Sequence, residues 1–116
     1  MPKSPYPHNG RLPSGQIADL ASLVEYAPHS IVSRQLVKND AGTITLFAFD
    51  QGQSLSEHST PFDALVQVID GQAEMMIGGK SFLVKVGQLI IMPAEVPHAV
   101  RAPQRFKMLL TMLRPR

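Results

Sequence analysis

Three observations predict that this chain is an all-β protein built as a sandwich or a small barrel. After residue 30 the sequence is a series of short apolar runs separated by turn residues. Helical periodicity is confined to one stretch near the N-terminus. Gly78-Gly79 is a strong hairpin signal, because a two-residue primed turn needs positive φ at both central positions. Many short strands with regular turns and little helix are typical of sandwiches and barrels.

The size and composition of the chain limit its class. With 116 residues, 44% of them hydrophobic, we expect one domain with a single core. The absence of cysteine excludes disulfides and thiolate chemistry. No run is long and apolar enough to span a bilayer, and the first ten residues lack the apolar stretch of a secretory signal, so we expect a cytoplasmic protein without a membrane partner. The net charge of +2 comes from scattered Lys and Arg, which argues against a nucleic-acid partner.

Residues 1–30 are predicted to be a tail with a short helix or an extended arm, and residues 31–116 the barrel domain. Proline and glycine are dense in the first fifteen residues, which favours a loosely docked tail. Between residues 16 and 25, apolar side chains three and four positions apart indicate a short helix; they are Ile17, Leu20 and Val24. Ser14 is the candidate cap of this helix, and Pro28 ends it at the latest.

The strand-like runs that follow are IVSRQLV, TITLFAF, ALVQVI, AEMMI, SFLV, QLIIM and FKMLLTML. Two of them, ALVQVI and FKMLLTML, carry apolar residues on both faces. A single small barrel buries only its inner face. We therefore predict a homodimer in which outward-facing strand residues pack against a partner.

Two stretches bounded by glycine turns each contain one histidine. They are GQSLSEHSTPFDALVQVIDG, residues 52–71, and GQLIIMPAEVPHAVRA, residues 87–102. Together they resemble the two signature motifs of the cupin family, and the resemblance extends over roughly residues 43–113. It implies a small antiparallel jelly-roll barrel with a pocket inside, which in this family serves dioxygenases, isomerases, epimerases, decarboxylases and lyases.

In the first motif of the family, a glycine is followed by His-x-His, a glutamate and a second glycine. Gly52, His58 and Gly71 match that spacing here. Thr60 stands where the second histidine is expected, and Ala64 stands where the glutamate is expected.

In the second motif, a glycine is followed by Pro-x-Gly, a histidine and an asparagine. Gly87, Pro93 and His98 match, whereas Glu95 replaces the glycine and Ala102 replaces the asparagine. The resemblance therefore carries over two of the metal-binding histidines and no carboxylate.

By this resemblance His58 and His98 are the expected metal ligands, for a weakly bound divalent ion such as zinc, nickel, manganese or iron. Two neutral imidazoles leave the double charge of the ion uncompensated, so we expect low affinity. Thr60 could add a weak oxygen ligand or bind a metal-bound water, and Asp63 could turn inward at a bulge beside Pro61. The alternative interpretation is that both histidines are structural, hydrogen-bonded residues.

Two functions follow from this resemblance. The first is a small metal-dependent enzyme that acts on an unidentified small organic molecule. The second is a non-catalytic barrel that binds a small ligand without a functional metal. Either one needs a pocket beside the histidines, for which we expect apolar walls; the candidates are Phe47, Met92, Met108 and Met112.

Overall fold

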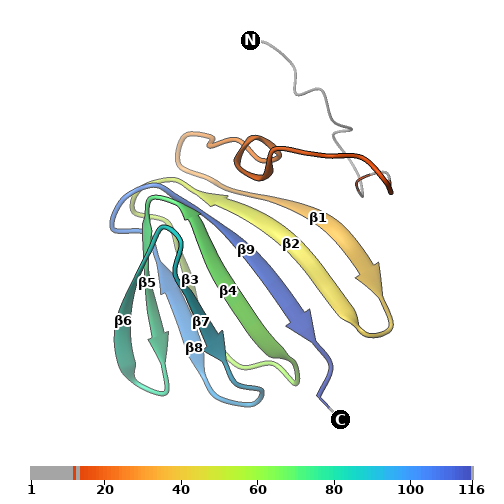
Figure 1. Cartoon of the computed structure of the whole chain (residues 1–116). Coiled ribbons are helices and arrows are strands. Elements are labelled where there is room, and N and C mark those ends of the chain that lie inside the picture. The colour runs from red at the N-terminus through yellow and green to blue at the C-terminus, as the bar shows by residue number, and fades with distance from the viewer. Residues whose placement is uncertain (1–11, 13, 116) are drawn as a thin grey trace.

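The computed structural model describes residues 12 and 14–115, and in this part of the chain it forms two antiparallel sheets (Figure 1). The five-stranded sheet has the order β1 (Ile31–Asn39), β2 (Gly42–Phe49), β9 (Phe106–Leu113), β4 (Asp63–Asp70) and β7 (Leu89–Met92). The four-stranded sheet has the order β3 (Ser54–His58), β8 (His98–Arg101), β5 (Gln72–Ile77) and β6 (Lys80–Lys85). The predicted all-β jelly-roll barrel is thus confirmed.

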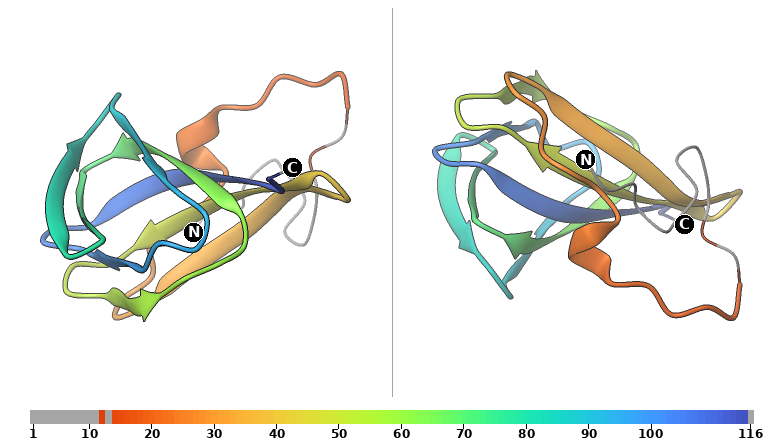
Figure 2. Two further views of the ribbon diagram at one scale, coloured as in Figure 1. Left: turned by 90° about the horizontal axis from the view of Figure 1, so that it is seen from below. Right: turned by 90° about the horizontal axis from the view of Figure 1, so that it is seen from above.

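The main core lies between the two sheets, which curve around it (Figure 2). The alternation of side chains along each strand determines which residues belong to this core. In β4, Ala64, Val66 and Val68 are buried, and the residues between them face outward. The rings of Phe49 and Phe106 are stacked at the centre, with their centroids 4.6 Å apart. Burying each such side chain stabilises the fold by ~1.5–3 kcal/mol.

The backbone conformation requires glycine at two turns. At Gly71, between β4 and β5, φ is +67°, and an added Cβ would lie 2.1 Å from the carbonyl oxygen of Arg105. Gly78 and Gly79 also have positive φ, and they connect β5 to β6 as the predicted two-residue hairpin, in which Ile77 pairs with Lys80.

The helix predicted over residues 16–25 is reduced to one turn of 3-10 helix, η1 (Leu20–Ser22). Ser14 does not cap it, since the residue before the turn is Asp19, and Ile17 is 97% exposed. The rest of residues 14–30, which we call the N-terminal arm, is non-helical and lies along the five-stranded sheet (Figure 1). The predicted loose tail lies mainly at residues 1–11 and 13, outside the described part of the chain.

The reason for the difference is tertiary packing. Leu23 and Val24 are both buried against the outer face of the five-stranded sheet, where they form a second apolar cluster with Leu36, Leu46 and Ala48. Helical spacing within ten residues is a weaker determinant than this contact. The N-terminal arm therefore covers part of the apolar outer face for which we predicted a partner subunit.

Polar contacts hold the N-terminal arm in place. The hydroxyl of Tyr26 donates a hydrogen bond to Asp70 at 2.5 Å, and the guanidinium carbon of Arg105 lies 3.9 Å from the centre of the Tyr26 ring. The Nζ of Lys107 donates to the carbonyl of Ala21 at 2.6 Å. These contacts join the N-terminal arm to β4 and β9.

The described part of the N-terminal arm leaves another part of the outer face exposed. Leu89 and Ile91 on β7 and Leu113 on β9 are each more than half exposed. Among the described residues, no helix is long and apolar enough to cross a membrane.

Candidate functional site

The two motif histidines come together at one end of the barrel. His58 ends β3 and His98 begins β8, and the two residues are paired across the four-stranded sheet. Their rings meet edge to face, with centroids 4.4 Å apart and planes at 66°. An irregularity in the pairing between Leu55 and His58 adjusts the register just before this contact.

Both histidines line a pocket of about 50 Å³, together with the residues that were predicted to form its walls. All four predicted wall residues line it, namely Phe47, Met92, Met108 and Met112, and so does Thr60, the predicted ligand or water contact. The sequence analysis missed Leu55, Val100 and Leu110, which also line it. Strand alternation could have identified Val100, two positions after His98, and Leu110, between Met108 and Met112. Leu55 could not be found in this way, because the strand pairing is irregular between Leu55 and His58.

Backbone carbonyls orient both imidazoles. Nδ1 of His58 lies 2.9 Å from the carbonyl oxygen of Ser56, and Nδ1 of His98 lies 3.1 Å from that of Val96. A carbonyl oxygen accepts only, so each Nδ1 carries the proton and donates it. The lone pair of each ring is therefore on Nε2, which is the arrangement of metal-ligating histidines whose other nitrogen is held by a carbonyl.

The two histidines differ in exposure. His98 is 4% exposed, whereas His58 lies at the solvent-accessible side of the pocket. Burial lowers the pKa of His98, and the nearby charge of His58 lowers it further, against the opposing effect of the hydrogen bond to Val96. The His98 imidazole is thus kept neutral and able to act as a ligand or hydrogen-bond acceptor.

The possible replacements for the missing ligands have other partners. Asp63 accepts a hydrogen bond from the backbone N–H of Ala94 at 2.9 Å, in an exposed position. The Thr60 hydroxyl is occupied in a local turn, where it donates to the carbonyl of Phe62 and accepts from the Phe62 N–H. Within the described residues, no three His, Cys, Asp or Glu side chains gather at one point.

The position of the missing glutamate does face the pocket. Ala64 is 2% exposed and contributes to the lining. Its neighbours across the sheet are Met92 on β7 and Met112 on β9, and both line the same pocket. Two thioether side chains therefore flank the place where the motif has a carboxylate.

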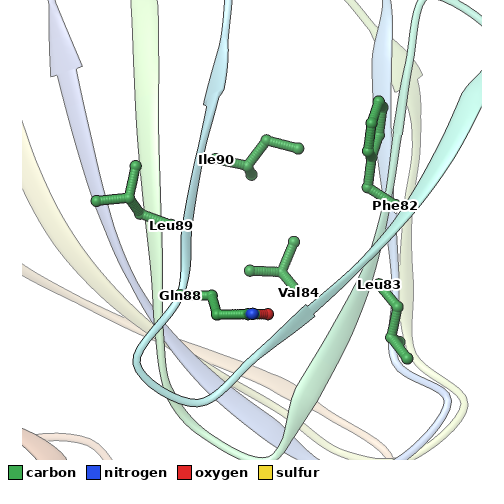
Figure 3. Close-up of a pocket in the computed structure, with 6 residues that line it drawn as sticks. All are labelled: Phe82, Leu83, Val84, Gln88, Leu89 and Ile90. Carbon is green, nitrogen blue, oxygen red and sulfur yellow. The ribbon is translucent and has the colours of Figure 1, made fainter.

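A larger hollow lies between β6 and β7 (Figure 3). Its volume is about 420 Å³, and its lining is apolar except for Gln88, whose side-chain oxygen accepts a hydrogen bond from the N–H of Lys85. It is an open groove without convergent polar groups. The smaller histidine pocket is the better candidate for chemistry.

These features define a small antiparallel barrel protein with a paired-histidine pocket between its sheets. Residues 45–112 match the family model of the cupin domain, and the chain belongs to the cupin family.

Solved structures extend the similarity to nearly the whole chain. A conserved protein of unknown function from Streptococcus pyogenes is 34% identical, with a TM-score of 0.86, over 97% of this chain and 99% of that one. A cupin superfamily protein from Desulfitobacterium hafniense is 30% identical, with a TM-score of 0.84, over 90% and 96% of the two chains. A cupin 2 conserved barrel domain protein from Leptotrichia buccalis is 42% identical, with a TM-score of 0.78, over 80% and 45%. No curated protein matches the chain.

Proposed function

We propose that this protein binds a metal ion through the Nε2 atoms of His58 and His98 and a small organic molecule in the pocket beside it. The observation that carries this proposal is the pair of Nδ1 contacts to backbone carbonyls, which leave two lone pairs on adjoining rings. The lowered pKa of His98 supports it, because a ligating imidazole must be unprotonated.

The donor set fits a metal ion in part. Among the divalent ions expected from the sequence, two imidazoles suit zinc, nickel or iron, whereas manganese prefers oxygen ligands; no carboxylate in the described part of the chain joins the histidines. Weak binding with several open coordination positions follows. A bound ion would supply Lewis acidity toward an oxygen of the organic molecule. The chain itself would hold the ion, keep His98 neutral and restrict the access of water to the ion through the apolar walls of the pocket.

A second candidate is a metal-free barrel that binds a small ligand. The observation in its favour is the mainly apolar lining of the pocket, in which His58 and His98 are the ionisable residues. In that function the two Nε2 atoms accept hydrogen bonds from a ligand that carries N–H or O–H groups.

Elemental analysis of protein purified without chelator tests the metal proposal. We expect up to one metal per chain after loading with zinc or nickel, and its loss in both His58→Ala and His98→Ala. The control is His29→Asn, which removes a histidine outside the pocket and keeps a residue type that tolerates the positive φ of 55° at this position. Absence of metal from the loaded wild type would overturn the proposal and favour the ligand-binding barrel.

We also propose that the protein forms a homodimer through the uncovered part of the five-stranded sheet. Support comes from Leu89, Ile91 and Leu113, which are exposed by 53 to 58% on its outer face. Large apolar side chains that are exposed on one sheet face are candidates for a protein contact.

A further inference from the structure

We propose that the metal of this pocket is monovalent copper, with the thioether sulfurs of Met92 and Met112 as ligands alongside His58 and His98. This inference rests on the proposed function, since it requires that the two histidines bind a metal at all. It names the kind of ion and adds two residues of this chain to the coordination.

The first argument is position. Met92 and Met112 are the cross-strand neighbours of Ala64 on either side, and all three line the histidine pocket. Met92 is 3% exposed, and Met112 is partly buried. The methyl group of Ala64 is too short to supply a ligand. The unbranched side chains of its two neighbours are long enough for their sulfur atoms to reach the same part of the wall.

The second argument is ligand chemistry. Thioether sulfur is a soft donor that selects Cu(I), whereas magnesium, calcium and manganese prefer carboxylate and carbonyl oxygens. Imidazole nitrogen binds copper as well as zinc, nickel and iron. A pocket with two imidazoles, methionine sulfurs and no carboxylate therefore matches monovalent copper better than the divalent ions expected from the sequence.

The third argument is charge. All the donors are neutral, and the walls beside them include Phe47, Leu55 and Val100. The cost of transferring an ion from water to an apolar site rises with the square of its charge, so a divalent ion costs about four times as much as a monovalent one of the same size. Without an anionic ligand, this difference favours the monovalent ion.

A competition titration tests the inference. The wild type and three variants are titrated anaerobically with Cu(I), against bicinchoninate in the presence of ascorbate, and in parallel with Zn(II). Met92→Leu and Met112→Leu remove sulfur and keep the apolar volume. Met75→Leu is the matched control, because Met75 is a fully buried methionine of the core that does not line the pocket.

We expect Cu(I) to bind the wild type with an affinity that falls at least about tenfold in Met92→Leu and Met112→Leu, a loss of ~1.4 kcal/mol each. The zinc affinity of these two variants should equal that of the wild type, and so should the Cu(I) affinity of the control Met75→Leu. In selenomethionine-labelled protein, the X-ray absorption spectrum at the copper edge should contain copper–selenium scattering.

Three results would overturn the inference, and they are distinguishable. Nitrogen-only coordination, or Cu(I) affinity that is unaffected by both leucine variants, removes Met92 and Met112 from the site. Binding of Zn(II) without Cu(I) rejects copper and leaves the proposed function intact. No binding of either ion, with both histidines present and the protein folded, rejects the proposed function as well.

Discussion

Ala64 occupies the one pocket position at which the family motif carries a carboxylate. Its side chain faces inward and is 2% exposed, so a longer side chain there would extend toward His58 and His98. We expect Ala64→Glu to raise zinc affinity at least about tenfold, because the carboxylate compensates the charge of the ion, at ~1.4 kcal/mol per tenfold. Competition with a chromogenic chelator measures this change.

Ala64→Gln is the matched control, since it has nearly the same volume without the charge. The glutamate variant without metal should be less stable than the glutamine variant at neutral pH, because it buries a carboxylate. Equal zinc affinity in the two variants would contradict the placement of residue 64 beside the ion.

Gly71 and Gly79 differ in what surrounds them, although both have positive φ. A Cβ at Gly71 would collide with the backbone of Arg105 and Phe106, whereas a Cβ at Gly79 would meet nothing within 4 Å. We expect Gly79→Ala to cost ~1 kcal/mol of stability, from backbone strain alone. Gly71→Ala should cost clearly more, because backbone must shift. Urea unfolding of both variants gives the comparison, and equal losses would contradict it.

The sequence analysis identified the two histidines because motif spacing specifies them residue by residue. It could not supply their tautomers, since these depend on the carbonyls of Ser56 and Val96. It also left Asp63 open as a ligand. A hydrogen bond from the backbone N–H of Ala94, 31 positions away in sequence, holds this carboxylate in an exposed position.

The N-terminal arm is held to the barrel by Tyr26. Burial raises the pKa of the Tyr26 hydroxyl well above 10, and the hydrogen bond to Asp70 and the charge of Asp70 raise it further, against the effect of Arg105. The folded-state pKa thus exceeds the unfolded value of ~10. The stabilisation from this group is complete below pH 10 and is lost as the pH rises above it.

We therefore expect the wild type to lose stability between pH 9 and pH 11 more steeply than Tyr26→Phe, which lacks the ionising group. At pH 7 the variant should be less stable by ~1 kcal/mol, through loss of the hydrogen bond to Asp70. Chemical denaturation at several pH values measures both effects. Parallel curves for the two proteins over this range would rule out a role for Tyr26 ionisation.

Strands were more predictable than the N-terminal arm. In β4, the alternation of Ala64, Val66 and Val68 with outward-facing residues indicates a strand directly. In the N-terminal arm, the spacing of Ile17, Leu20 and Val24 matched a helix, but only Val24 is buried among the three. Periodicity indicates which residues could share one face of a helix. Packing against the apolar surface of a sheet can favour a non-helical conformation instead.

The proposed assembly of two chains rests on the exposed part of the outer face of the five-stranded sheet. We expect light scattering to give twice the chain mass of 12.7 kDa for the wild type and the single mass for Ile91→Glu, because the charge would be buried in the contact. Leu83→Glu is the control, since Leu83 is 51% exposed but lies on β6 of the other sheet. A monomeric wild type, or an unaffected Ile91→Glu, would contradict this interface.

The order of strands in space was beyond the sequence analysis. Turn residues indicate where strands end, but they do not say which strands pair across long separations. In the five-stranded sheet, β9 lies between β2 and β4, so the last strand of the chain is paired on both edges. This arrangement depends on side-chain packing contributed by the entire barrel.

The central place of β9 has a consequence for synthesis on the ribosome. Until Phe106–Leu113 has emerged, β2 and β4 each lack one of their two neighbouring strands, and the ring of Phe49 lacks the ring of Phe106. A nascent chain therefore exposes unpaired strand edges and apolar rings until β9 has been synthesised. Folding of this barrel must follow the synthesis of β9, and the chain that still lacks β9 is the form that most needs a chaperone.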